Sequence, residues 1–274
     1  MQSLEAMTVA ITGGSGRVGK ALREILSPLC KAVRIIDIVP PEKTLQNERY
    51  INVDTANLDA LVAAFEGVDG VIHLAGLPTE KSIEETLHVN VLGVNNVYEA
   101  ARRTGVGRVV LGSSNHVVGF YPRTEYVGPD APMRPDSLYG LSKCWGELTA
   151  GLYWDKAGIR SLIIRIGNAF PQVTSPRSIE IWISARDLAQ LTTIGLTHED
   201  ITCTTVYGVS AGGGSWWDNS VAERLGYKPQ DRSIDFATPE AFKPQASEKP
   251  EITEFFQGGI FCEWGHDGKL RLRD

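Results

Sequence analysis

The 274-residue sequence lacks several features that would define its class at once. Its four cysteines, Cys30, Cys144, Cys203 and Cys262, include no Cys-X-X-Cys pair. This spacing argues against a disulfide framework or a zinc ribbon and favours reduced thiols in a cytoplasmic protein. The five histidines form no pair at ligand spacing, so we expect no metal. A net charge of -6 leaves no basic stripe for nucleic acid.

Long apolar runs are also missing. No stretch approaches the roughly 18 residues that a membrane helix requires, so we expect no membrane partner. Residues 1–6 lack the basic and apolar regions of a signal peptide. The composition is instead that of an ordinary globular protein, with 42% hydrophobic and 22% charged residues. A chain of this length forms one large α/β domain or two small ones.

Strand-like and helix-like segments alternate along most of the chain. Several strand-like segments are continuous runs of Val, Ile and Leu, as expected for strands covered on both faces. The alternation predicts an α/β fold with a Rossmann-like, doubly wound parallel sheet and helices on both faces. We expect strands at Thr8–Thr12, Ala32–Asp37, Tyr50–Asp54, Val71–Ala75, Arg108–Ser113, Ser161–Ile166 and Thr204–Val209, and helices at Lys20–Leu26, Leu58–Phe65, Ile83–Arg103, Leu138–Lys156 and Ala185–Ile194.

The most informative motif is the glycine-rich segment that follows the first strand-like run. Gly13 permits a tight turn, Gly16 lets a diphosphate approach the backbone, and Gly19 lets the next helix pack closely. The N–H groups at the start of that helix, around Arg17 and Val18, point at the diphosphate. Strand, glycines, helix, strand and acid follow one another in the order typical of a dinucleotide site.

Two aspartates end the next strand-like runs. Asp37 is expected to accept hydrogen bonds from the adenosine ribose and to repel a 2′-phosphate, which favours NAD over NADP. The alternative is a solvated aspartate at a strand end. Asp54 is expected at the adenine edge, or alternatively as the cap of the helix that begins near Asn57.

A second motif, Tyr139-Gly-Leu-Ser-Lys143, places its tyrosine and lysine on one face of a helix that Asp136 or Ser137 can cap. A nearby ammonium favours the phenolate, so Tyr139 can serve as a general base. The segment Ser113–His116 ends a strand and can orient a substrate oxygen. In a parallel sheet, ligands lie at the carboxyl ends of strands, where all these residues are expected.

The ordered motifs resemble the extended short-chain dehydrogenase/reductase family, from about Met7 to Gly226. They comprise TGGSGRVG, HLAG at 73–76, Asn90, SSN at 113–115 and YxxxK. The resemblance implies a catalytic triad of Ser114, Tyr139 and Lys143, with the lysine also on the nicotinamide ribose. It implies further NAD contacts from Leu74, Ala75, Gly76 and Asn90.

The longer strings SSNHVVGFYP, LYGLSK, RIG, WWDN and FQGG resemble the uronate-oxidising members of that family. Those enzymes oxidise glucuronate or galacturonate at C1 to the aldarolactone with NAD. The resemblance implies that this chain does the same, although Pro78 and Asn168 stand where the pattern has serine. It implies substrate contacts from Ser114, Asn115, His116, Tyr139, Asn168 and Arg177.

Several of these residues have a structural alternative. Arg177 offers a planar fork for the substrate carboxylate, but we expect residues 174–178 to form a polar loop, where an arginine can simply be solvated. His116 can be a structural histidine. Trp216 and Trp217 can stack on a sugar or belong to the core or an interface. Cys144, beside the catalytic lysine, is expected to be a small buried residue rather than a nucleophile.

No linker marks off a second domain. We expect residues 1–274 to form a single NAD-binding domain, in which about 168–274 contribute substrate-binding loops and a tail. Residues 229–251 read as loop with short helical turns, and the apolar run Phe255–Phe261 is expected to dock on the body. The short C-terminal portion has no basic pair for a nucleotide diphosphate, which favours a small substrate over that of the alternative, an NAD-dependent nucleotide-sugar epimerase or dehydratase.

Two further expectations concern class and assembly. A non-catalytic NAD sensor would be expected to lose Tyr139 or Lys143, and both are present. In the wider family, helices that match Ile83–Arg103 and Leu138–Lys156 pair across a dimer. The resemblance therefore implies a homo-oligomer, either a dimer or a hexamer built from dimers.

Overall fold

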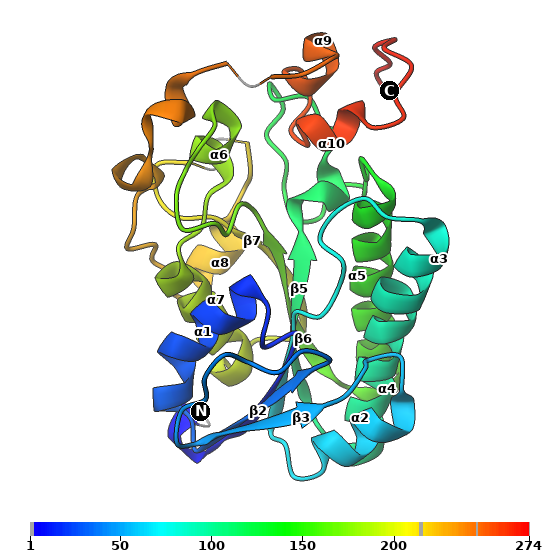
Figure 1. Ribbon diagram of the computed structural model, residues 1–274, viewed down its shortest axis with the longest axis vertical. Coiled ribbons are helices and arrows are strands. Elements are labelled where there is room, and N and C mark those ends of the chain that lie inside the picture. The colour runs from blue at the N-terminus through cyan, green and yellow to red at the C-terminus, as the bar shows by residue number, and fades with distance from the viewer. Residues whose placement is uncertain (1–2, 214–215, 245, 274) are drawn as a thin grey trace.

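A central sheet of seven parallel strands organises the computed structural model, which describes residues 3–213, 216–244 and 246–273 (Figure 1). The strand order is β3-β2-β1-β4-β5-β6-β7. The chain thus starts in the middle, winds out to one edge, returns to β4 and winds out to the other edge. The strands are β1 (Thr8–Thr12), β2 (Ala32–Asp37), β3 (Glu48–Asn52), β4 (Gly70–His73), β5 (Arg108–Ser114), β6 (Arg160–Ile166) and β7 (Cys203–Gly208). The expected Rossmann-like doubly wound fold is confirmed.

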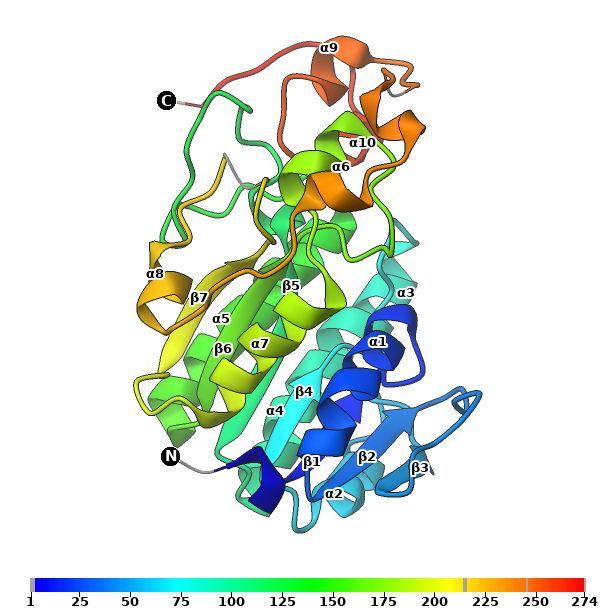
Figure 2. The ribbon, with the colours of Figure 1, turned by 90° about the vertical axis from the view of Figure 1, so that its left-hand side faces the viewer.

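Helices cover both faces of this sheet (Figure 2). One layer holds α1 (Arg17–Leu26) and α7 (Ala185–Thr197), whose leucines pack on β1 and β6. The other holds α2 (Leu58–Phe65), α4 (Gly93–Thr104) and α5 (Leu138–Ala157). The inner strands β4 and β6 are buried along most of their length, as expected for strands covered on both faces, whereas the edge strand β3 is polar and only partly buried.

The short helices lie mostly at the carboxyl end of the sheet or on the connections. α6, α9 and α10 gather beyond the carboxyl end of β5 (Figure 1). The short α-helices are α3 (Ile83–Thr86), α6 (Pro176–Ile181), α8 (Ser220–Arg224), α9 (Pro250–Thr253) and α10 (Ile260–Glu263). Single turns of 3₁₀-helix are η1 (Leu4–Ala6), η2 (Ser27–Leu29), η4 (Asn115–Val118), η5 (Ser233–Phe236) and η6 (Pro239–Phe242), and a π-helical turn η3 (Leu87–Leu92) joins α3 to α4.

Some boundaries differ from the sequence expectation for local reasons. β3 lies two residues earlier than expected, and β4 ends two residues early. One further backbone bond to the neighbouring strand follows each of them, from Val53 N to Asp37 O and from Leu74 N to Thr12 O. α1 begins directly after Gly16 instead of at Lys20. The expected polar loop 174–178 is wrong, since α6 begins there, capped by Ser175 with a proline in its first turn. That capping signal was present in the sequence.

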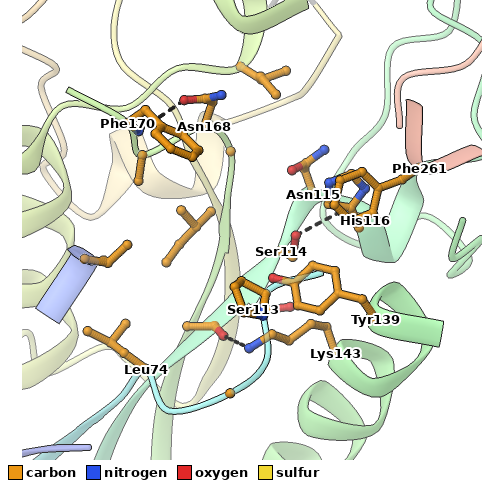
Figure 3. A pocket seen from close by; sticks show the side chains of 18 of the residues that line it. Leu74, Ser113, Ser114, Asn115, His116, Tyr139, Lys143, Asn168, Phe170 and Phe261 are labelled. Carbon is orange, nitrogen blue, oxygen red and sulfur yellow. Dashed lines mark hydrogen bonds between the residues drawn. The ribbon is translucent and has the colours of Figure 1, made fainter. Parts of the chain in front are cut away.

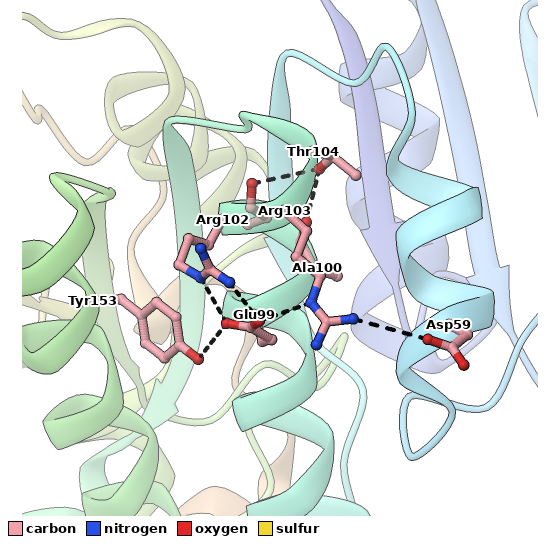
Figure 4. Close-up of polar contacts among 8 residues, drawn as sticks. Asp59, Glu99, Ala100, Arg102, Arg103, Thr104 and Tyr153 are labelled. Carbon is pink, nitrogen blue, oxygen red and sulfur yellow. Dashed lines mark hydrogen bonds and ion pairs between the residues drawn. The ribbon is translucent and has the colours of Figure 1, made fainter.

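An ionic cluster ties α4 to α5 on the outer surface (Figure 4). The Glu99 carboxylate accepts from Arg102 Nε at 2.9 Å, Arg103 Nε at 2.8 Å and the Tyr153 hydroxyl at 3.2 Å. These donors, the Arg102 hydrogen bond first, lower the pKa of Glu99 to about 2. The Tyr153 hydrogen bond therefore links the carboxyl-terminal half of α5 to that of α4.

Other expectations about the chain as a whole meet the structure as follows. The tail docks on the body through Gln257 N to Tyr121 O at 2.9 Å and Gly258 N to Gly119 O at 2.8 Å, which confirms that expectation. All four cysteines are unpaired. Across the described ranges, no helix has the length and apolarity to cross a membrane, and no cluster of potential metal ligands occurs.

Candidate active site

The glycine turn after β1 is built so tightly that it excludes side chains. Gly13 has φ +69°, and a Cβ on it would lie 2.6 Å from Ala75 N in the loop after β4. A Cβ on Gly19 would lie 2.4 Å from Gly13 O. Gly16 precedes α1 and offers no side-chain cap, so the first N–H groups of the helix remain available for an anion.

Asp37 is part of this turn and not merely solvated. Its Oδ2 accepts from Ser15 N at 3.0 Å and its Oδ1 from Val39 N at 3.1 Å. Its carboxylate therefore joins the glycine turn to the loop after β2. Arg34, the nearest cation along the same strand, is engaged elsewhere, donating to Ala64 O at 2.7 Å.

Asp54 lies at the same edge of the sheet. Its Oδ1 accepts from Ala56 N at 2.9 Å within its own turn. The cap of α2 is Asn57, which accepts from Ala60 N at 3.1 Å, so the alternative of Asp54 as the helix cap is wrong.

Two adjoining cavities run along the carboxyl ends of the strands. The first is bordered by the glycine turn, Asp37, Asp54 and the β4 loop. The second contains the Tyr139 motif and the residues after β5 and β6. Both share Leu74, Gly76 and Leu77, so together they form one elongated site. A dinucleotide fits this arrangement, because its diphosphate requires the side-chain-free cradle of Gly13 and Gly19.

Asn90 shapes the wall between the two cavities. Its Oδ1 accepts from Leu77 N at 2.7 Å, and its Nδ2 donates to Leu77 O at 3.1 Å and to Ser142 Oγ at 2.9 Å. With both ends of the amide occupied in this way, Asn90 holds the loop that lines the cofactor groove.

The two serines that end β5 have different tasks. Ser113 Oγ donates to Glu147 Oε1 at 2.6 Å. The same carboxylate accepts from Arg165 Nε at 3.0 Å and Nη2 at 2.9 Å, so a buried ion pair lies beneath the site. Ser114 instead lines the second cavity, accepts from His116 N at 3.2 Å and hydrogen-bonds Tyr139.

Tyr139 and Lys143 project from α5 into the second cavity beside Ser114 (Figure 3). Ser137, one of the two expected caps, accepts from Gly140 N at 3.0 Å and starts the helix. Lys143 Nζ donates to Gly112 O at 2.9 Å and lies 5.7 Å from the centroid of the Tyr139 ring. The geometry suits a base and its cation.

Burial dominates the titration of both groups. It raises the pKa of Tyr139 to about 12, against the opposing effect of the Ser114 hydrogen bond. It lowers the pKa of Lys143 to about 8. The ammonium therefore remains charged at pH 7, but burial and not the ammonium sets the pKa of the phenol in this structure. The expected lowering by Lys143 requires additional positive charge at the site.

His116 lies beside Tyr139, with ring centroids 5.8 Å apart in an edge-on arrangement. Its Nδ1 lies 2.6 Å from Asp136 Oδ2, and its ring stacks on Phe261 with centroids 3.8 Å apart (Figure 3). The second expected cap of α5, Asp136, is thus a partner of this histidine. Phe261 comes from α10, and the sequence analysis expected its segment to dock without identifying it as part of the site.

Arg177 lies at the start of α6 and lines the same cavity. Its Nε donates to Gln257 O at 2.6 Å, and its Nη2 lies 2.8 Å from the Asn115 amide, whose orientation is assigned so that the oxygen accepts. Burial lowers its pKa to about 10. The alternative of a solvated arginine is therefore wrong.

Asn168 and Arg17 frame the remaining side. Asn168 Oδ1 accepts from Phe170 N at 3.1 Å, and its backbone N donates to Ile181 O at 2.7 Å (Figure 3). The Arg17 guanidinium lies 3.5 Å from the centroid of the Phe170 ring. The helix start at the glycine turn thus contacts the loop after β6.

Two other residue groups lie away from the chemistry. Trp217 is buried, stacks on Tyr207 with centroids 4.9 Å apart, and neither it nor Trp216 lines the cavity. Their core role is confirmed. Cys144 is buried, as expected, and burial raises the pKa of its thiol to about 12.

Several known proteins are similar to this chain in sequence and in fold. The NAD dependent epimerase/dehydratase family matches residues 9–200. A uronate dehydrogenase of Pseudomonas putida is 44% identical over 257 residues, which cover 93% of this chain and 95% of that protein. The structure resembles that of a mutant uronate dehydrogenase from Agrobacterium tumefaciens complexed with NAD, with TM-score 0.86, 38% identity and coverage of 94% and 97%. It also resembles a glucuronic acid dehydrogenase from Chromohalobacter salexigens, with TM-score 0.88, 39% identity and the same coverage. The chain belongs to the NAD-dependent epimerase/dehydratase family, in the branch that contains the uronate dehydrogenases.

Proposed function

We propose that this chain oxidises a hexuronate, glucuronate or galacturonate, at C1 to the aldarolactone with NAD. The main observation in favour of a uronate substrate is the environment of Arg177. Arg177 is a half-buried guanidinium in the same cavity as Ser114, Tyr139 and Lys143, and within the described chain it forms no ion pair with a carboxylate. A half-buried cation of this kind is stabilised when a substrate supplies the carboxylate.

The chain's own residues perform the proton transfer. Tyr139 takes the proton of the anomeric hydroxyl, and Ser114, which hydrogen-bonds Tyr139, donates to the same substrate oxygen. Bound NAD supplies the acceptor for the C1 hydride and a positive charge beside the phenol. Together with the Lys143 ammonium, that charge favours the phenolate over the buried phenol. The organic product is the lactone, whose formation requires no water.

The cofactor contacts follow the elongated site. Gly13, Gly16, Arg17, Val18 and Gly19 hold the diphosphate at the start of α1. The other proposed NAD contacts are Asp37 at the adenosine ribose, Asp54 at the adenine, Leu74, Ala75 and Gly76 at the wall, Asn90 through Leu77, and Tyr139 with Lys143 at the nicotinamide ribose.

The substrate contacts come from both halves of the chain. Arg177 binds the C6 carboxylate, next to Asn115. The ring hydroxyls form hydrogen bonds with His116 and Asn168, and the C1 oxygen forms one with Ser114. Residues 168–274 thus complete a single NAD-binding domain with substrate loops.

The proposal includes a homo-oligomer in the cytoplasm, where unpaired thiols are typical. Leu141, Trp145, Leu148 and Leu152 form an exposed stripe along α5, with Leu148 64% exposed. Their spacing of three or four residues places them on one helix face. A second copy that covers this stripe gives a dimer, or a hexamer built from dimers.

The direct test is NADH absorbance. The purified enzyme, given NAD and glucuronate or galacturonate, is expected to produce NADH in proportion to time and enzyme. A tightly retained cofactor with no net NADH from either uronate would contradict the proposal and indicate a nucleotide-sugar epimerase or dehydratase instead.

A further inference from the structure

The segment Gln257–Gly259 of the C-terminal tail lies against the two charged residues at the back of the substrate cavity. A Cβ on Gly258 would lie 2.1 Å from Asp136 Oδ2. A Cβ on Gly259, which has φ +63°, would lie 2.6 Å from Arg177 Cδ and 2.9 Å from its Nε. The tail therefore passes so close to both side chains that only glycine fits.

Gln257 is held rigidly within this segment. It is fully buried, and each of its polar atoms has a partner. Its Nε2 donates to Pro122 O at 3.0 Å and to Glu125 O at 2.9 Å. Its Oε1 accepts from Trp217 Nε1 at 2.8 Å, and its backbone N donates to Tyr121 O. The one remaining polar atom, the backbone oxygen, accepts from Arg177.

Two contacts orient the Arg177 guanidinium. Nε donates to Gln257 O at 2.6 Å, and Nη2 donates to the Asn115 side-chain oxygen at 2.8 Å. A guanidinium carries five N–H donors in a planar fork, so three remain for the cavity. Phe261, two residues after Gly259, closes the cavity beside them.

These partners fix the guanidinium without neutralising it. Gln257 O and the Asn115 amide are uncharged acceptors. Asp136 is the buried carboxylate that interacts electrostatically with Arg177. It accepts hydrogen bonds from other groups, His116 Nδ1 at 2.6 Å and Ser137 Oγ at 2.8 Å. The cost of desolvating a cation thus remains to be offset by an anion from outside.

We propose that Gln257, held by Trp217, and Gly259 position Arg177 for the C6 carboxylate of the substrate. This role rests on the proposed function. It also explains two sequence motifs, WWDN at 216–219 and FQGG at 256–259, which no other step of the reaction uses. Gln257, Gly259 and Trp217 are positioning residues, because they act on substrate only through Arg177.

The test compares two glycines of the same tail. Gly259 and Gly265 both have positive φ, so alanine strains either backbone, but a Cβ on Gly265 meets nothing within 4 Å. We expect Gly259→Ala to raise KM for glucuronate by about tenfold or more, with kcat and KM for NAD changed by less than about twofold. Gly265→Ala should leave all three within about twofold. Equal KM values for glucuronate in the two variants would overturn the proposal.

A second pair keeps the test decisive if Gly259→Ala fails to fold. Trp217→Phe keeps an aromatic ring against Tyr207 but removes the hydrogen-bond donor to Gln257. The control is Tyr227→Phe, which removes a buried hydrogen bond to Val209 O at 2.7 Å away from the cavity. Trp217→Phe should raise KM for glucuronate by about threefold or more, and Tyr227→Phe should not. A parent enzyme that makes no NADH from uronates refutes the proposed function, and this role with it. A fully active parent with indistinguishable variants refutes only the positioning role.

Discussion

Replacing Arg177 by alanine tests the carboxylate site most directly. The guanidinium has three N–H donors left for the cavity after its bonds to Gln257 and Asn115. Two of them suffice for a bidentate contact with a carboxylate. Hydrogen bonds to charged groups contribute about 1.5–3 kcal/mol each, so the loss of the fork costs about 3–6 kcal/mol. At about 1.4 kcal/mol per decade, kcat/KM for glucuronate should fall by about 10² to 10⁴.

The assay compares two substrates. Glucose has the same ring with a hydroxymethyl group at C6, and should be a poor substrate of the parent that Arg177→Ala barely affects. Arg177→Lys should recover only part of the loss with glucuronate, because an ammonium lacks the planar fork. If both sugars lose the same factor, Arg177 is structural, and the carboxylate site must be sought at His116 and Asn115 instead.

Three further outcomes are expected. Tyr139→Phe should lower kcat by about 10² to 10⁴ with NAD affinity nearly intact, because it removes the base while Lys143 and the rest of the cofactor groove remain, and turnover within about tenfold of the parent would exclude that role. Asp37→Ala should lower kcat/KM for NAD by about tenfold or more, because an acceptor for the ribose hydroxyls is lost. It should also raise the ratio of kcat/KM for NADP to kcat/KM for NAD, because the carboxylate that repels a 2′-phosphate is removed. An unchanged ratio means that another residue recognises the ribose. Leu148→Glu should shift the sedimenting species toward the 29.9 kDa protomer, because it places charge in the exposed stripe of α5, and a parent already at that mass at micromolar concentration would count against the oligomer.

The sequence predicted the fold well because the strands are buried on both faces. Mainly apolar strands such as β1 and β2 place Val and Ile in the core, and their bounds in the structure are those that the sequence predicted. The roles of Gly13 and Gly19 were predicted equally well, since a Cβ at either position would collide with the backbone. Local rules of this kind require no knowledge of the rest of the chain.

Residues whose environment depends on distant segments were not predictable in the same way. Phe261 and Gln257 reach the site only because the tail returns to the carboxyl end of the sheet, which no periodicity encodes. The pKa of Tyr139 is a further case, because burial by the assembled cavity outweighs the neighbouring lysine that the spacing revealed. The choice between Asp136 and Ser137 as the cap of α5 was likewise settled by His116, which takes the aspartate.

The buried pair of Glu147 and Arg165 has a consequence for the enzyme in concentrated salt. Glu147 follows Tyr139 and Lys143 at steps of four residues on the same face of α5, and it clamps that helix to β5 through Ser113 and to β6 through Arg165. Mobile ions screen such a buried pair far less than they screen exposed charges. The relative position of Tyr139 and Ser114 should therefore change little with the ionic strength of the medium. Surface ion pairs, such as those of Glu99, should weaken over the same range of salt.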